Sequence, residues 1–202
     1  MNLKKTMESF DGISRYFAVA GGWALLGLSV LIGVDVIGRK LFNFSTQGSD
    51  EIGGYVMAVV CAFGFSYALT RRSHIRLNIL LPRLPNWVRV LANLIAYTIL
   101  VIFAYMMIWR ALAVLMETIH LSAVAPTPLE TPMVIPHSLW TLGLAWFALH
   151  ITVYLMVLLS LLFKNQIIDL LKIFDAEPPA EEAAHEVEEI VEEIKGTVQK
   201  LN

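Results

Sequence analysis

The feature that most constrains this chain is an apolar run of 19 residues without a charge, residues 52–70. At ~1.5 Å per residue, a helix of this length crosses the ~30 Å hydrocarbon core of a membrane. Five arginines follow in the short connection to the next apolar run: Arg71, Arg72, Arg76, Arg83 and Arg89. Because such clusters stay on the cytoplasmic side during insertion, we predict a membrane-spanning helix followed by a cytoplasmic connection that sets the topology.

The composition extends this prediction to the whole chain. Of its 202 residues, 57% are hydrophobic and the mean hydropathy is +0.65, which is too apolar for a single soluble domain. Apolar runs of helical length recur, so we predict an all-α integral membrane protein with four transmembrane helices. Their expected positions are about 16–37, 52–70, 87–117 and 139–163, within a membrane domain of residues 16–165.

The two ends of the chain are more polar than this domain. In residues 1–15 apolar side chains recur every three or four positions with the charges opposite, which indicates an N-terminal interfacial helix; a frayed polar terminus is the alternative of equal weight. From Asp169 onward ten acidic residues face three lysines. Beyond Pro178 and Pro179 apolar residues share one helical face, so residues 166–202 are predicted to form an acidic, partly helical amphipathic tail, either solvated or docked on a partner.

The distribution of basic residues predicts the orientation of all four spans. With the three lysines of the tail left aside, placing both termini in the cytoplasm puts nine basic residues inside and three outside. The inner nine are Lys4, Lys5, Arg15, Lys164 and the five arginines after the second span, and the outer three are Arg39, Lys40 and Arg110. This excess agrees with the positive-inside rule. A basic membrane body with an acidic tail does not have the charge pattern of a nucleic-acid-binding protein.

Four charged residues mark the predicted outer ends of the first two spans. Asp35 and Arg39 are four residues apart in the acid-before-base order that favours an ion pair on a helix. Ser49 is expected to cap the second span, and Asp50 and Glu51 stand where a helix dipole favours negative charge. Asp35 and Arg39 therefore form either a surface pair or a partner contact, whereas capping suffices to explain Asp50 and Glu51.

Small residues recur every four positions along the second span and form a packing ridge: Gly54, Ala58, Ala62 and Ser66. Helix packing in lipid relies on such residues, so another helix of this chain or of a partner should lie against the ridge. Cys61, the single cysteine, excludes an intrachain disulfide and is interpreted as core filling.

No pattern in the sequence supplies a reaction centre, a metal site or a transport path. Glu117 and His120 match one Glu-x-x-His element of di-iron bundles, but the chain offers no second copy. Haem would need histidines on two facing spans, and only His150 lies within one. For His150 a hydrogen bond to another helix is the simpler explanation. We therefore expect a non-enzymatic subunit without a cofactor.

Four short motifs, in order, resemble those of one transporter family. They are DVIGRKLF at 35–42, DE at 50–51, HIRLN at 74–78 and TPMVIP at 131–136, within a similarity that covers about residues 15–165. The order and spacing are similar to those of the small membrane subunit, the Q-type small permease, of tripartite ATP-independent periplasmic (TRAP) transporters.

This resemblance implies a protein of the bacterial inner membrane with two partners. One is a large permease subunit that carries an organic acid together with sodium, and the other is a periplasmic substrate-binding protein. The small subunit would scaffold the large one, with Asp35, Arg39, Asp50 and Glu51 as outer partner contacts and the small-residue ridge as a packing seam. Two alternatives are a membrane anchor of a redox complex and the small subunit of a tripartite tricarboxylate transporter.

Overall fold

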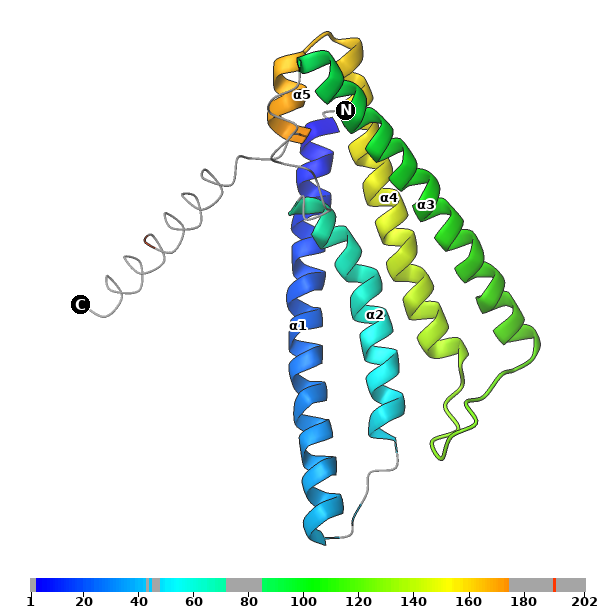
Figure 1. Cartoon of the computed structure of the whole chain (residues 1–202). Coiled ribbons are helices and arrows are strands. Elements are labelled where there is room, and N and C mark those ends of the chain that lie inside the picture. Colours follow the sequence, from blue (N-terminus) through cyan, green and yellow to red (C-terminus); the bar gives the residue numbers. More distant parts are fainter. Residues whose placement is uncertain (1–2, 43, 45–47, 72–84, 175–190, 192–202) are drawn as a thin grey trace. The chain divides into compact units, whose positions relative to one another are not determined.

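A computed structural model describes residues 3–42, 44, 48–71, 85–174 and 191. Its helices are α1 (Leu3–Phe42), α2 (Ser49–Thr70), α3 (Asn86–His120), α4 (Val134–Phe163) and α5 (Ile167–Phe174). In this described part, the first four are long and apolar enough to cross a membrane, which confirms the predicted all-α class with four spans (Figure 1). The predicted amphipathic helix beyond Pro179 lies outside the described residues, as do Arg72, Arg76 and Arg83.

The chain divides into two compact units. The first comprises Met1–His74 and Leu94–Ser160, and so contains α1, α2 and most of α3 and α4. The second comprises Ile75–Asn93 and Leu161–Asn202. In its described part α5 follows a turn at Asn165, which has a φ of 54°, and buries Leu170 and Phe174.

Helix α1 begins at Leu3 and continues without a break to Phe42. The predicted boundary between the N-terminal arm and the first span, at residue 15, is therefore not the end of a helix. Phe17 of α1 packs against Phe63 of α2 with ring centroids 4.6 Å apart, and Gly21 lies beside Val60. These contacts place α1 alongside α2 in the first unit, as Figure 1 shows.

Helices α2 and α4 approach each other closely at Gly143. A Cβ added there would lie 2.8 Å from the Cβ of Ala62 and 3.1 Å from the backbone nitrogen of Phe63. Only glycine leaves room for this contact, as is usual where membrane helices approach closely. Beside it Ala62, Leu144 and Ala111 of α3 form a buried cluster, so α2, α3 and α4 meet in one layer.

The connection between α3 and α4, residues 121–133, is ordered although it contains three prolines. The backbone N–H of Ala125 donates to the carbonyl of Thr131, and that of Met133 to the carbonyl of Ala123, each over 3.0 Å. Ser122 and Glu130 take φ angles of 46° and 48°, which permit the tight reversals. The connection is thus ordered without being helical.

Much of the apolar surface of the spans is exposed in the single chain. Trp23 of α1 is 70% exposed and Trp109 of α3 is 67% exposed. Cys61 is also exposed, so the interpretation of this residue as core filling is wrong. In a membrane the lipid-facing side of a helix is as apolar as its buried side, and an apolar neighbourhood in the sequence therefore does not indicate burial.

Candidate functional site

Buried polar side chains of the first unit gather at the two ends of α2, which we call the Thr70 end and the Ser49 end. A polar group within a membrane domain is costly unless it is hydrogen-bonded, and it therefore marks a structural or functional site. We describe these two sites and a groove between them.

At the Thr70 end, the carboxylate of Asp11 joins three helices. Its Oδ1 accepts hydrogen bonds from Nε2 of His150 at 3.1 Å, from the hydroxyl of Tyr154 at 2.8 Å and from Oγ1 of Thr70 at 3.0 Å. His150 and Tyr154 belong to α4, and Thr70 is the last residue of α2. Asp11 thus fastens α1 to both neighbours.

A second chain of hydrogen bonds completes this network. The indole N–H of Trp146 donates to Oγ of Ser14 over 3.1 Å, and that hydroxyl lies 3.2 Å from Nδ1 of His150. Because Nε2 donates to Asp11, a neutral imidazole accepts from Ser14 through Nδ1, and every member of the chain then has a consistent role. Phe10 stacks on Trp146 with ring centroids 4.8 Å apart.

These contacts, named here the Asp11 network, bear on two predictions. His150 forms hydrogen bonds to another helix, as predicted. Asp11 does not lie on an outward polar face of the N-terminal helix, because its carboxylate points at α2 and α4, and Ser14 is fully buried. The sequence carries no local signal for either contact, since their partners are more than 50 residues away.

At the Ser49 end, Asp35 is buried, and Oδ2 of its carboxylate accepts hydrogen bonds from side chains of both α1 and α2. The guanidinium of Arg39 pairs with its Oδ2, as the spacing of four residues predicts, and the hydroxyl of Ser49 donates to the same oxygen over 2.9 Å. Ser49 does not cap α2, because the N-cap is Gly48 and makes no side-chain hydrogen bond there. The Ser49 hydroxyl is instead used to connect α2 with α1.

Glu51, in the first turn of α2, bonds to the connection between α3 and α4. Its Oε1 accepts a hydrogen bond from the hydroxyl of Tyr55 over 2.8 Å, and its Oε2 accepts one from Oγ1 of Thr127. The Tyr55 oxygen also lies 3.3 Å from the sulfur of Met133, the last residue before α4. The carboxylate therefore ties the start of α2 to the ordered loop.

Of the four predicted partner contacts, some form hydrogen bonds within the chain and others are exposed to a partner. Asp35 and Glu51 form hydrogen bonds within the chain, whereas Asp50 is exposed and the side chain of Arg39 is 47% exposed. On the predicted ridge, Ala62 and Ser66 are buried in the first unit, while Gly54 and Ala58 are exposed. Of the topology-setting arginines, Arg71 is exposed and donates to the Tyr67 hydroxyl over 2.9 Å.

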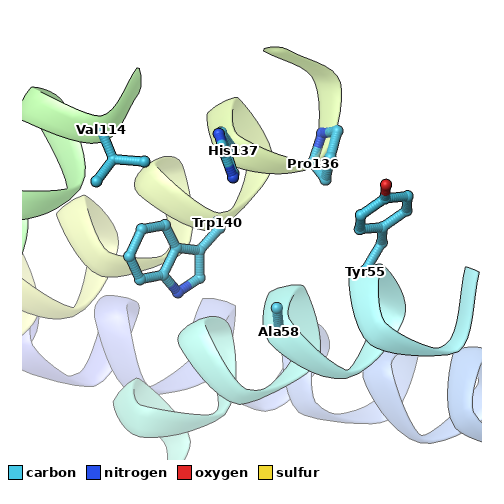
Figure 2. Close-up of a pocket in the computed structure, with 6 residues that line it drawn as sticks. All are labelled: Tyr55, Ala58, Val114, Pro136, His137 and Trp140. Atoms are coloured by element: carbon cyan, nitrogen blue, oxygen red, sulfur yellow. The ribbon is translucent and has the colours of Figure 1, made fainter. Parts of the chain in front are cut away.

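A groove of about 340 Å³ opens between α2, α3 and α4. Figure 2 shows its lining: Tyr55, Ala58, Val114, Pro136, His137 and Trp140. His137 Nδ1 is bonded to the hydroxyl of Thr118 at 2.7 Å, and the rest of the lining is mostly apolar. The groove thus presents a shape and an apolar surface, but no arrangement of nucleophile and base.

The arrangement of the described residues suits holding helices together. No group of three or more His, Cys, Asp or Glu side chains that could bind a metal ion occurs in the described ranges. The polar side chains at both ends of α2 bond neighbouring helices to each other. Together with four apolar helices, these features define a polytopic membrane protein with fixed helix contacts.

Comparison with known families identifies which kind of membrane protein this is. The family described as "Tripartite ATP-independent periplasmic transporters, DctQ component" matches residues 28–161. Because the match covers more than half of the chain, the protein belongs to this family, which is the small permease component of TRAP transporters. The resemblance found in the sequence motifs is confirmed. No curated protein and no solved structure matches the chain.

Proposed function

We propose that this protein scaffolds the large permease subunit of a TRAP transporter for sodium-coupled, binding-protein-dependent uptake of an organic acid. The observation that carries the proposal is the family match over residues 28–161, which includes the contacts at the Ser49 end and the α2 and α4 residues that bond to Asp11 and Ser14 at the Thr70 end. A scaffold needs fixed helices and an apolar surface for its partner. The polar contacts at both ends of α2 supply the first, and exposed apolar faces supply the second.

Co-purification tests the association. The chain, tagged and expressed at native level, is extracted from its own membrane in a mild detergent, and the proteins recovered with it are identified. We expect the large permease subunit in stoichiometric amount, and an unrelated four-span protein with the same tag serves as the control. Recovery of a lone chain that transports substrate by itself would contradict the proposal.

The sodium ion and the organic acid are expected to bind elsewhere, on the large subunit and the binding protein. Uptake into proteoliposomes that contain both membrane subunits is measured with the binding protein outside, with and without an inward sodium gradient. We expect uptake only with the gradient and the binding protein. Equal uptake from vesicles that lack the small subunit would remove the scaffolding role.

We infer that both termini face the cytoplasm in the bacterial inner membrane, with the Ser49 end facing the periplasm. The arginine-rich connection and the positive-inside rule support this orientation. Single cysteines in a Cys61→Ser background, one in the connection after α2 and one between α3 and α4, are labelled in spheroplasts with a membrane-impermeant maleimide. Only the second should react, and labelling of the first would reverse the orientation.

Arg39 is the predicted periplasmic contact that the structure leaves half-exposed. Reversing its charge in Arg39→Glu should raise the concentration of binding protein at half-maximal uptake about fivefold, since rim charges act mainly on association. Arg39→Gln, which also breaks the pair with Asp35, is the control for loss of the intrachain contact. Unchanged uptake with Arg39→Glu would exclude Arg39 as a docking residue.

A further inference from the structure

The position of Arg110 on α3 is not explained by contacts within the described chain. Its neighbour Ala111 is fully buried in a cluster with Ala62 of α2 and Leu144 of α4. Ala62 is thirteen residues from the Ser49 end of α2 and eight from the Thr70 end, or ~20 Å and ~12 Å along the helix. Arg110 therefore lies at a depth near the middle of the span that α2 makes, and not outside the membrane where the count of basic residues placed it.

At this depth Arg110 is exposed on the surface of the bundle. No ion pair or hydrogen bond joins its side chain to any of the residues that the structure describes. Glu117, the nearest acid along α3, is seven residues away, or ~10 Å along the axis. A charged side chain facing hydrocarbon is among the costliest arrangements in a membrane protein, and such residues pair with one another or with a partner.

The groove described above lies beside this arginine. Val114, which lines the groove on the α3 side, is four residues from Arg110 and thus one turn away on the same flank of the helix. On the α2 side the lining residue Ala58 is small and exposed, and Gly54, one turn further, has no other atom within 4 Å of the place of a Cβ. Small, open positions of this kind permit the backbone of another helix to come close.

We propose that this groove is the binding site for a membrane-spanning helix of the large permease subunit, and that a carboxylate on that helix pairs with Arg110. The inference rests on the proposed function, because it identifies a surface for the same partner. The positive charge of Arg110 favours a protein helix with an acidic side chain over lipid as the occupant of the groove. Acyl chains would fill the groove but carry no charge, and phosphate groups lie at the membrane surface, ~15 Å from the midplane.

Photo-crosslinking in the intact complex locates the partner. The photoreactive amino acid p-benzoylphenylalanine replaces Val114, which leaves Arg110 in place, and the control position is Leu112 on the opposite flank of α3. We expect adducts from position 114 with one membrane segment of the large subunit that contains Asp or Glu, and none from position 112. Adducts with lipid alone at both positions would overturn the proposal.

Charge variants then test the ion pair. Arg110→Gln should lower the amount of large subunit that co-purifies by about tenfold, whereas Arg110→Lys retains the charge and most of the binding. Lys40→Gln is the matched control, because Lys40 is an exposed base at the very end of α1. Arg110→Glu should also lose the large subunit, and replacing the acidic residue of the cross-linked segment of that subunit with arginine should restore co-purification.

The outcomes separate this inference from the proposed function. If the wild-type chain does not co-purify the large subunit, both the proposed function and the proposed helix-binding groove are refuted. If the wild type co-purifies the large subunit and Arg110→Gln does so equally well, only the helix-binding groove is refuted. The amount of each variant in the membrane is measured in parallel, and reversal of the Arg110→Glu defect by the second-site change excludes simple misfolding.

Discussion

Replacing Asp11 with alanine removes a single carboxylate oxygen that receives hydrogen bonds from Thr70, His150 and Tyr154. Interhelical hydrogen bonds in membrane proteins contribute ~0.6 kcal/mol each on average, with a maximum of ~1.7 kcal/mol. Three such bonds correspond to a loss of about 2 kcal/mol in the free energy of unfolding, with an upper bound of about 5 kcal/mol. We expect Asp11→Ala to fall near the lower figure, because the carboxylate is partly exposed and water replaces some of the lost bonds.

The free energy of unfolding is measured by titrating the purified chain in detergent micelles with sodium dodecyl sulfate, followed by circular dichroism. Tyr154→Phe, which removes only one of the three donors, should cost about 0.6 kcal/mol. In the double mutant of Asp11→Ala with His150→Ala, the two changes should be non-additive by at least 0.5 kcal/mol or so, since the residues are in contact. An Asp11→Ala variant within about 0.5 kcal/mol of the wild type would refute the view that this network fastens α1 to the bundle.

Three further predictions concern helix contacts. Gly143→Ala should destabilise the chain by about 1–3 kcal/mol in the same titration, because its new Cβ overlaps Ala62. Adding Ala62→Gly should recover part of that loss. If the effects of the two changes on the free energy of unfolding are strictly additive, the close approach is contradicted. Glu51→Gln weakens the bonds to the loop between α3 and α4, so amide hydrogen exchange there should accelerate, and unchanged protection would show that the backbone hydrogen bonds suffice. Ser49→Ala removes a donor to buried Asp35 and should cost about 1 kcal/mol, whereas a neutral effect would mean that the remaining contacts satisfy the carboxylate.

The architecture was predictable because membrane insertion depends on the length and hydrophobicity of charge-free runs, and both are visible in the sequence. A charge-free run long enough to cross hydrocarbon can only be a helix here, since no other single segment satisfies its own backbone groups. The predicted spans all fall within the observed helices, although α1 and α4 extend beyond the predicted ends. Helices do not stop where hydrophobicity stops, because their hydrogen-bonded backbone continues into the interface.

The ion pair between Asp35 and Arg39 was predictable because it is local. A spacing of four residues brings two side chains together on any helix, whatever the tertiary structure. The use of Ser49 was not predictable in the same way. A serine at the start of a helix can cap it, but the buried Asp35 of a neighbouring helix offered a charged acceptor, and a hydrogen bond to a charged group is the stronger one.

The Asp11 network could not be derived from the sequence. Its members come from positions 11, 14, 70, 146, 150 and 154, which lie on three helices, and only the packing of those helices brings them together. Hydrophobic periodicity even misassigned Asp11, because it treats every charge as facing water. A polar residue can instead face the interior when the interior provides enough hydrogen-bond donors.

Helices α1 and α2 are bonded to each other at both extremities, through Asp11 and Thr70 at one and through Asp35 and Ser49 at the other. A slip of one helix along the other by a single residue, ~1.5 Å, would stretch both hydrogen bonds beyond their working length at the same moment. The hydrogen bonds at the two ends of α2 thus fix the axial position of α2 against α1 in both directions. Such a fixed register is what the proposed scaffolding role requires of this pair of helices.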